Sequence, residues 1–248
     1  GGYFGEDYLN DVLYKDDLAL VPLQVDFIER IVRPGEHASF LDVACGPGRT
    51  CLELARRGYQ KITGIDVNSF FLEKGRAHAK EAGLDIKFVQ LDMRQRAFSE
   101  CFDIVLCVGT SIGYFDSDKE NEAAIKNMVM ALKSGGTLLI EIWKHLDSDS
   151  KDPQNWEWEE VREDGSRYFV KTSFDPTSKR NHVTIDHTSQ EGNSSHRVEV
   201  HYRAYTPQEL KDMLERFGLT VKIFYLGYWE WSETPIYEDR TQRVVWIA

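Results

Sequence analysis

The sequence predicts an α/β fold, in which a doubly wound, seven-stranded, mostly parallel sheet carries an inserted antiparallel β layer. Three observations support this prediction. Short apolar runs alternate with amphipathic helical patterns over most of the chain. A tight glycine turn joins the first apolar run to its helix. Between residues 147 and 205 the helical periodicity disappears, and short strand-like segments separated by turn residues replace it.

The first 37 residues are expected to form an N-terminal lid and a helix. Apolar residues spaced along one side predict a helix over residues 18–32, which Pro34-Gly35 ends. The preceding segment is rich in aromatic and acidic residues and includes Tyr3 and Tyr8. These tyrosines suit either packing of the segment onto the body of the protein or a lid over a ligand.

Strand and helix patterns alternate from residue 39 to residue 143. The expected strands are residues 39–44, 61–66, 86–91, 102–108 and 137–143, and the expected helices are residues 49–57, 69–81 and 120–132. Ser69 is the expected N-cap of the second helix, and Ser134-Gly135-Gly136 is expected to end the third. The last two strands are nearly continuous apolar runs, which is typical of parallel strands covered on both faces.

Residues 147–205 are expected to form the antiparallel insertion. Its expected strands are residues 156–160, 168–174, 182–188 and 196–203. The segment Thr206-Pro207-Gln208-Glu209 then predicts a capping box and a helix that runs to residue 217. Strands over residues 219–226 and 243–247 would complete the sheet, so that residues 38–146 and 206–248 form the core.

The chain is organised around the turn between the first strand and its helix. Cys45 to Gly48 is too small and too rich in glycine and proline to continue the strand. Such a turn lets a ligand approach the backbone and directs the N–H groups of a helix start toward it. About 20 residues later the second strand ends at Asp66, a spacing at which a carboxylate can bind both hydroxyls of a ribose. The pair of features predicts a nucleoside cofactor.

The dinucleotide fingerprint G-x-G-x-x-G matches the turn only in part. Gly46 and Gly48 fit, but Cys51 occupies the third glycine position, which is expected to loosen the packing of the helix there. A partial match is weak support for NAD, so an NAD-dependent oxidoreductase stays one alternative.

The order of motifs resembles that of the class I S-adenosylmethionine-dependent methyltransferases over residues 38–143 and 206–248. The matching segments are Asp42 to Gly48, then Asp66, Asp92-Met93, Cys107 to Tyr114, and Leu132 to Leu138. The resemblance implies a Rossmann-like methyltransferase fold and S-adenosyl-L-methionine as cofactor. Ala44 stands where the family usually has the first glycine of its loop.

The resemblance also implies roles for the matching residues. Asp42 would hold the amino-acid end of the cofactor, and the loop residues Ala44, Gly46 and Gly48 would line its methionine and ribose. Asp66 would bind the ribose hydroxyls.

At the adenine, Val67 or Asn68 would border the ring, Asp92 would accept from the amino group, and the Met93 backbone would meet the ring. Cys107-Val108 would end the fourth strand beneath the sulfonium. For Asp66 and Asp92, a carboxylate that caps the following helix is the alternative.

The acceptor is expected to be a small molecule. No N/D-P-P-Y motif follows the fourth strand, whereas residues 109–115 resemble the S-S-I-G-H segment of bacterial methyltransferases that act on amino-sugars and other small amines or hydroxyls. Those proteins also carry an antiparallel insertion. Their histidine falls at Tyr114 here, and a phenol is a poorer base near neutral pH. Tyr114 would therefore orient the acceptor, or else serve only to pack the loop.

Other candidates surround the expected reaction centre. His145 follows the fifth strand and could act as a general base. Glu141 on that strand either contacts substrate or is a buried, hydrogen-bonded carboxylate. Trp156 and Trp158, together with Tyr3 and Tyr8, would suit an amine acceptor through cation–π contacts, and a solvated acidic edge is the alternative. No pair of histidines shows metal-ligand spacing with a third partner, so no metal is predicted.

Charge and cysteine usage limit the partners. The formal net charge is −11, and the sequence shows no cluster of Lys and Arg such as nucleic acid or an anionic membrane would require. It contains no apolar run long enough to span a bilayer and no secretory signal. The four cysteines lie in or beside apolar runs without a CxxC pair, so we expect reduced core thiols in a cytoplasmic protein.

Taken together, these patterns predict methyl transfer from S-adenosylmethionine to a small-molecule amine or hydroxyl by direct displacement. A non-catalytic S-adenosylmethionine-binding partner or sensor protein is an alternative. The insertion is expected to cover the substrate or to form the surface of a homodimer.

Overall fold

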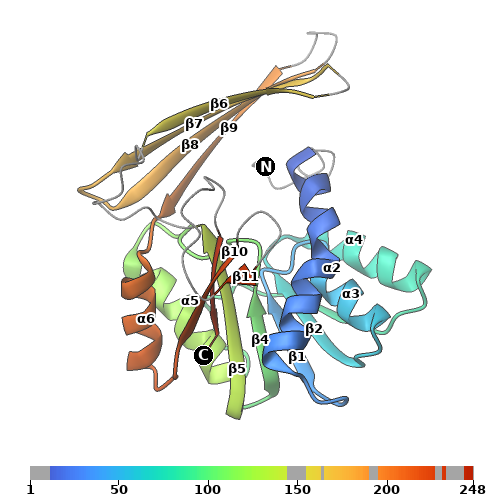
Figure 1. Ribbon diagram of the computed structural model, residues 1–248. Helices are drawn as coiled ribbons and strands as arrows, with labels where there is room; N and C mark the ends of the chain where they lie inside the picture. Colours follow the sequence, from blue (N-terminus) through green and yellow to red (C-terminus); the bar gives the residue numbers. More distant parts are fainter. Residues whose placement is uncertain are drawn as a thin grey trace.

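The strands that the structure describes form two separate sheets. The computed structural model describes residues 12–143, 155–162, 165–189, 195–226, 231–232 and 243–247. The larger sheet has eight strands in the order β11-β10-β12-β5-β4-β1-β2-β3, and the smaller has four in the order β6-β7-β8-β9. Figure 1 shows the smaller sheet standing over one edge of the larger one.

The larger sheet is parallel over its five strands β3, β2, β1, β4 and β5. Its strands are β1 (Ser39–Val43), β2 (Lys61–Asp66), β3 (Lys87–Gln90), β4 (Phe102–Cys107), β5 (Leu132–Trp143), β10 (Lys222–Leu226), β11 (Trp231–Ser232) and β12 (Arg243–Ile247). Strand β12 pairs antiparallel with β5, and β10 pairs antiparallel with β12. The predicted doubly wound sheet is confirmed, with the short β11 as an eighth strand where seven were expected.

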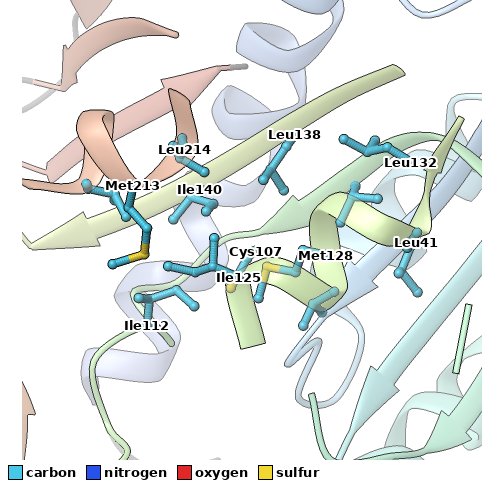
Figure 2. Packing of buried hydrophobic residues seen from close by; sticks show 14 of the residues in the cluster. Leu41, Cys107, Ile112, Ile125, Met128, Leu132, Leu138, Ile140, Met213 and Leu214 are labelled. Carbon is cyan, nitrogen blue, oxygen red and sulfur yellow. The ribbon is translucent and has the colours of Figure 1, made fainter. Parts of the chain in front are cut away.

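Helices cover both faces of this sheet (Figure 1). The helices are α2 (Val12–Val32), α3 (Arg49–Arg56), α4 (Ser69–Glu81), α5 (Asp118–Ala131) and α6 (Pro207–Arg216). Because side chains alternate along a strand, Phe40 belongs to the buried cluster that includes residues of α2, α3 and α4, while its neighbour Leu41 belongs to the cluster that includes residues of α5 and α6. Figure 2 shows residues of the second of these layers, among them Ile125 and Met128 of α5 and Met213 and Leu214 of α6.

The smaller sheet confirms the inserted antiparallel layer. Its strands are β6 (Trp156–Val161), β7 (Arg167–Asp175), β8 (Arg180–Thr188) and β9 (Ser195–Arg203). Along β7, the buried residues Tyr168, Val170 and Thr172 alternate with exposed ones. Over this part of β7, one face is therefore buried and the other solvated, whereas the residues of β8 are all partly exposed.

Several local predictions are corrected by the structure. The helix predicted over residues 18–32 begins at Val12, and it continues through Pro22. The side chain of Asn68, not Ser69, caps α4 by accepting from Phe70 N and Phe71 N. Helix α5 ends at Ala131 and passes directly into β5, so the glycines at 135–136 lie within a strand.

Two further predictions concern single side chains. The capping box is confirmed, since Thr206 Oγ1 accepts from Glu209 N at 3.1 Å and Glu209 Oε2 accepts from Thr206 N at 3.0 Å. All four cysteines are free thiols, but Cys101 is exposed, so the prediction that all of them lie in the core was wrong for this one.

Within the described residues, no helix combines the length and apolar character that crossing a membrane would need.

Candidate functional site

The carboxyl ends of the parallel strands meet at the edge over which the smaller sheet stands (Figure 1). Strand β1 lies between β2 and β4, so the chain winds away from β1 in both directions. In open α/β sheets this switch point is where ligands bind. The glycine turn after β1, Asp66 at the end of β2 and the loop after β4 all lie at this point.

The glycine turn takes up the left-handed backbone that the sequence pattern requires. Ala44, Gly46 and Gly48 have φ angles of 56°, 55° and 79°. Gly48 occupies the N-cap of α3 and therefore gives the helix no side-chain cap. The backbone N–H groups in the first turn of α3 therefore have no side-chain cap and can donate to a ligand or to solvent.

The residue at the third fingerprint position is accommodated in an unexpected way. Cys51 is fully buried, and a Cβ added to Gly64 of β2 would lie 3.1 Å from Cys51 Sγ and 2.9 Å from Cys45 Sγ. The close approach of helix to strand is preserved because the glycine is on the strand instead of the helix. The prediction that Cys51 loosens this packing was therefore wrong.

Asp42 is a buried carboxyl with one unused oxygen. The side chain is 2% exposed, and Oδ2 accepts from Cys51 Sγ at 3.2 Å. Within the described part of the chain, Oδ1 has no hydrogen-bond partner. Burial raises the pKa of Asp42 to about 7, and the Arg49 guanidinium opposes this rise. A buried acceptor without a donor is what a site for a cationic ligand group would present.

Asp66 is held by the backbone on both oxygens. Its Oδ2 accepts from Gly46 N and its Oδ1 accepts from Asn68 N, each at 2.8 Å. Burial raises the pKa of Asp66 although these N–H groups oppose the rise. Because Asn68 caps α4, the alternative that Asp66 is the helix cap is excluded. Each carboxylate oxygen keeps a lone pair for a further donor.

Asp92 lies after β3 and is engaged by a neighbouring guanidinium. Arg94 Nη2 donates to Asp92 Oδ2 at 2.6 Å, and hydrogen bonds from Arg94 lower the pKa of the carboxyl. Arg94 also donates to Glu120 Oε1 at 2.6 Å and stacks 4.6 Å from the Phe115 ring. The position expected to meet adenine is thereby linked to the loop after β4. Asp92 does not cap α5, whose N-cap is Ser117.

The remaining predicted cofactor residues differ in exposure. Val67 is 65% exposed, which leaves an apolar side chain beside Asp66 open to a ligand. The Met93 carbonyl accepts from Asn127 Nδ2 at 3.1 Å, so its backbone is fixed against α5. Cys107 is buried, and burial raises the pKa of its thiol. Val108 follows it and is half-buried.

The loop after β4 is fixed by two buried polar side chains. Glu141, which is 1% exposed, accepts from Gly109 N at 2.9 Å and from Gln24 Nε2 at 3.4 Å. The structure therefore favours the buried, hydrogen-bonded carboxylate over a substrate contact. Asn121 of α5 accepts from Gly113 N and donates to the carbonyls of Phe115 and Ser117.

The same loop joins the smaller sheet. Arg203 N donates to the Gly113 carbonyl at 2.8 Å, and a Cβ at Gly113 would lie 2.6 Å from the Arg203 carbonyl. Beside this contact the rings of Tyr114 and Tyr202 lie 5.8 Å apart. Tyr114 is half-buried and faces Tyr202, so the structure places this predicted residue between the core and the insertion.

Arg203 lies at the centre of the contact between β9 and the larger sheet's loop and helices, which we call the joint. The sequence did not predict its role. Its side chain is 5% exposed, its Nη2 lies 2.9 Å from Glu209 Oε1, and its Nε lies 3.3 Å from Asp118. It also stacks on the Tyr205 ring. Nothing in the local sequence marks this arginine, because its partners come from α5 and α6. Asn121 could have been found, since it shares a helical face with Ala124, Ile125 and Met128.

Not every predicted acceptor residue can be placed. Trp158 of β6 is 38% exposed. Tyr3, Tyr8 and His145 lie outside the described residues, as does the side chain of Trp156. Tyr202, half-buried opposite Tyr114, is a further aromatic residue that the sequence reasoning did not select.

Comparison with known proteins agrees with this arrangement. Residues 40–136 match the family described as "Methyltransferase domain". The chain is 29% identical over 175 residues to a dTDP-3-amino-3,4,6-trideoxy-alpha-D-glucopyranose N,N-dimethyltransferase of Streptomyces venezuelae. That match covers 71% of this chain and 65% of the relative, so the chain spans just under two thirds of the relative's length.

Solved structures show the same fold. The CcbJ methyltransferase of Streptomyces caelestis has a TM-score of 0.73 at 16% identity, covering 88% of this chain and 85% of its own. CalS10, an amino pentose methyltransferase of Micromonospora echinaspora solved with bound S-adenosylmethionine, has a TM-score of 0.67 at 20% identity, covering 94% and 90%.

The strand order around the glycine turn and the match over residues 40–136 show a methyltransferase-like fold in the core of this chain. Sugar N-methyltransferases are among the proteins to which the chain is similar.

Proposed function

We propose that the protein transfers a methyl group from S-adenosylmethionine to an amine or hydroxyl of a small molecule, with an amino-sugar as the first acceptor to test. The observation that carries this proposal is the Oδ1 atom of Asp42, which has no hydrogen-bond partner among the described residues and is buried beside the glycine turn. Gly46 N of that turn donates to Asp66. At this edge of the sheet, Asp42 can accept a hydrogen bond from a cationic ammonium group, and Asp66 can accept hydrogen bonds from the hydroxyls of a ribose.

The residues around the turn fit the cofactor. Asp42 would accept from its ammonium group, and the left-handed turn at Ala44, Gly46 and Gly48 would line its methionine and ribose. Asp66 would accept from the ribose hydroxyls through the lone pairs that the backbone leaves unused.

For the adenine we propose Val67, Asn68, Asp92 and Met93, and for the floor of the site Cys107-Val108. Val67 is exposed and can cover an aromatic ring, while Asn68 is held by its capping bonds. The thiol of Cys107 stays neutral because burial raises its pKa, so it does not compete as a nucleophile.

The bound cofactor supplies an already activated methyl group. The chain must then align the acceptor and exclude water. Tyr114 and Tyr202 lie together at the joint between core and insertion, and burial raises the pKa of Tyr202, so this phenol stays neutral. We assign Tyr114 the task of orienting the acceptor, and His145 stays the candidate for a general base.

The insertion over residues 147–205 would cover the acceptor, and residues 1–37 would include a lid. Trp158, together with Trp156, Tyr3 and Tyr8, would then provide aromatic faces for an amine. An amine acceptor is supported by the relative whose name specifies N,N-dimethylation of an amino-sugar nucleotide. A homodimer through the insertion stays a prediction. So does the cytoplasmic location, for which the four free thiols are the support.

A turnover assay tests this proposal. The purified chain is incubated with S-adenosylmethionine and with pairs of nucleotide-linked sugars that differ only by an amino group in place of a hydroxyl, and product is followed by mass spectrometry. We expect methylated product with at least one acceptor of the set, and lower kcat/KM for Tyr114→Ala than for Tyr114→Phe.

Tight binding of S-adenosylmethionine without turnover of any amine or hydroxyl would contradict the enzyme and favour a non-catalytic binding protein. A loss of kcat of roughly 100-fold or more in Tyr114→Phe would show that the hydroxyl acts as an acid or base rather than as an orienting group.

A further inference from the structure

Three ligand-type side chains come together on the smaller sheet, away from the glycine turn. His182 of β8 and His201 and Glu199 of β9 each offer one atom, and these three atoms lie within 4.8 Å of one another. The expectation that no histidine pair has a third partner was therefore wrong. Sequence spacing could not reveal the group, because 18 residues separate His182 from His201 along the chain, and only the register of β8 with β9 brings the two histidines together.

Strand register explains the cluster. His182 and His201 are direct cross-strand partners, and Glu199 lies two residues before His201, so all three point to the same face. The two imidazole rings are stacked, with centroids 4.1 Å apart and an interplanar angle of 17°. His182 Nε2 lies 3.9 Å from Glu199 Oε2.

Within the described residues, no hydrogen bond explains why His182 Nε2 lies next to Glu199. The distance of 3.9 Å between His182 Nε2 and Glu199 Oε2 is too long for a hydrogen bond. The Nε2 atom is shielded from solvent and has no hydrogen-bond partner there, although 43% of the His182 side chain is exposed. A shielded ring nitrogen that faces a second imidazole and a carboxylate is suited to hold a cation.

Neighbouring charges leave the carboxylate available. Arg197 on the same strand forms an ion pair with Asp186, with Nε 2.6 Å from Oδ1. Lys171 forms an ion pair with Glu157, with Nζ 2.7 Å from Oε1. Glu199 lies near these cations but has an ion-pair contact only with His182 among the described residues.

We propose that His182, Glu199 and His201 bind a divalent transition-metal cation, with zinc as the fitting probe. Two imidazole nitrogens and one carboxylate oxygen form a donor set that zinc takes, with a fourth position left for another ligand. Ligand atoms around tetrahedral zinc lie roughly 3.4 Å apart, and the lone pair of a ring nitrogen lies in the ring plane, so the two imidazoles would have to rotate out of their stack to bind one ion.

The position of the site indicates that a bound metal would stabilise the smaller sheet. Tyr202 points to the face that meets Tyr114, so its neighbour His201 points to the opposite face. The next pair on the same face of these strands is Arg180 and Arg203. Arg180 Nη2 donates to the Phe115 carbonyl and Arg203 N donates to the Gly113 carbonyl, both in the loop after β4. A metal here would hold β8 to β9 beside the joint and would take no part in methyl transfer.

Zinc titration of the full chain tests the proposal. The protein is freed of any affinity tag, stripped with a chelator and titrated with zinc by calorimetry, and thermal unfolding is measured with and without the metal. The variants are His182→Gln, His201→Gln and Glu199→Gln. The matched control is His187→Gln, because His187 lies on β8 on the opposite face, stacked on Tyr168.

We expect one zinc per chain and a rise in melting temperature for the wild type and for His187→Gln. Each of the three site variants should bind zinc at least tenfold more weakly and lose the rise in melting temperature. His201 is exposed, so a folding defect in that variant is not expected. Absence of zinc binding by the wild type, or equal binding by the site variants and the wild type, would overturn the proposal.

Discussion

The carboxylate of Asp66 accepts a 2.8 Å hydrogen bond from the backbone N–H of Gly46. This bond ties the end of β2 to the turn after β1, so the residues proposed for the ribose and for the methionine end are held in one fixed arrangement. Both oxygens of Asp66 are oriented by backbone N–H groups before any ligand binds. Such preorganisation reduces the entropy that binding would otherwise cost.

Ala44 occupies a left-handed backbone position, where φ is 56°. A non-glycine residue there costs about 1–2 kcal/mol, part of which glycine would lose again through the greater freedom of the unfolded chain. We therefore expect Ala44→Gly to stabilise the protein by about 0.5–1 kcal/mol in urea unfolding. The control Ala77→Gly, at an exposed position in the interior of α4, should destabilise it by about 1 kcal/mol. Equal destabilisation by both substitutions would contradict the strain.

Gly64 leaves room for two cysteine sulfurs, and a Cβ there would lie 2.9 Å from Cys45 Sγ. Gly64→Ala should therefore destabilise the protein by about 1–3 kcal/mol through overpacking. Adding Cys51→Ala should recover part of the loss, because it removes the other sulfur at 3.1 Å. The control Gly35→Ala meets no atom within 4 Å and should change little. If Gly64→Ala left the free energy of unfolding unchanged, the packing of α3 against β2 would not depend on this glycine.

Arg203 connects the smaller sheet to α5 and α6. Its side chain is 5% exposed and its partner Glu209 is 30% exposed, so Arg203→Met should cost about 2 kcal/mol of stability. The control Arg216→Met removes an exposed pair with Glu122 at 3.5 Å and should cost less than about 0.5 kcal/mol. Both are measured by chemical denaturation, and equal losses would argue against the proposed joint.

Asp42 makes stability depend on pH in the direction opposite to most carboxylates. Burial raises its pKa to about 7 in the folded state, so the folded protein keeps this proton to higher pH than the unfolded chain does. The contribution of Asp42 to stability therefore falls as pH rises from about 4 to about 7. Asp42→Asn cannot ionise and should lose this slope.

The measurement is the stability of Asp42→Asn relative to wild type across that pH range. The variant should gain with rising pH, by about 4 kcal/mol at most for a shift of this size. Asp85→Asn, at an exposed carboxyl, is the control and should show no such gain. A constant difference between Asp42→Asn and wild type at all pH values would show that the Asp42 carboxyl is not shifted.

Local chemistry was sufficient to predict most of the core. The strands over residues 102–108 and 137–143 were predictable because their nearly continuous apolar composition is typical of parallel strands covered on both faces. The capping box at Thr206 was also predictable, since all its partners lie within four residues. The error at Ser69 was a choice between two adjacent capping residues, which sequence alone does not separate.

Features that depend on distant partners were not predictable. Cys51 looked like a disruption until Gly64 on the neighbouring strand was seen to supply the missing space. Arg203 binds residues of two helices, and the cluster at His182 depends on the register between β8 and β9. These relationships arise from pairing and packing, which no local pattern in the chain records.

The central claim is that the edge at Asp66 binds S-adenosylmethionine, and calorimetric titration with S-adenosylhomocysteine tests it most directly. The titration compares wild type with Asp66→Ala and with the exposed control Asp85→Ala. The account predicts binding by wild type and control, and an affinity at least tenfold weaker in Asp66→Ala. Binding of NADH, with no binding of S-adenosylhomocysteine or S-adenosylmethionine by the wild type, would contradict it.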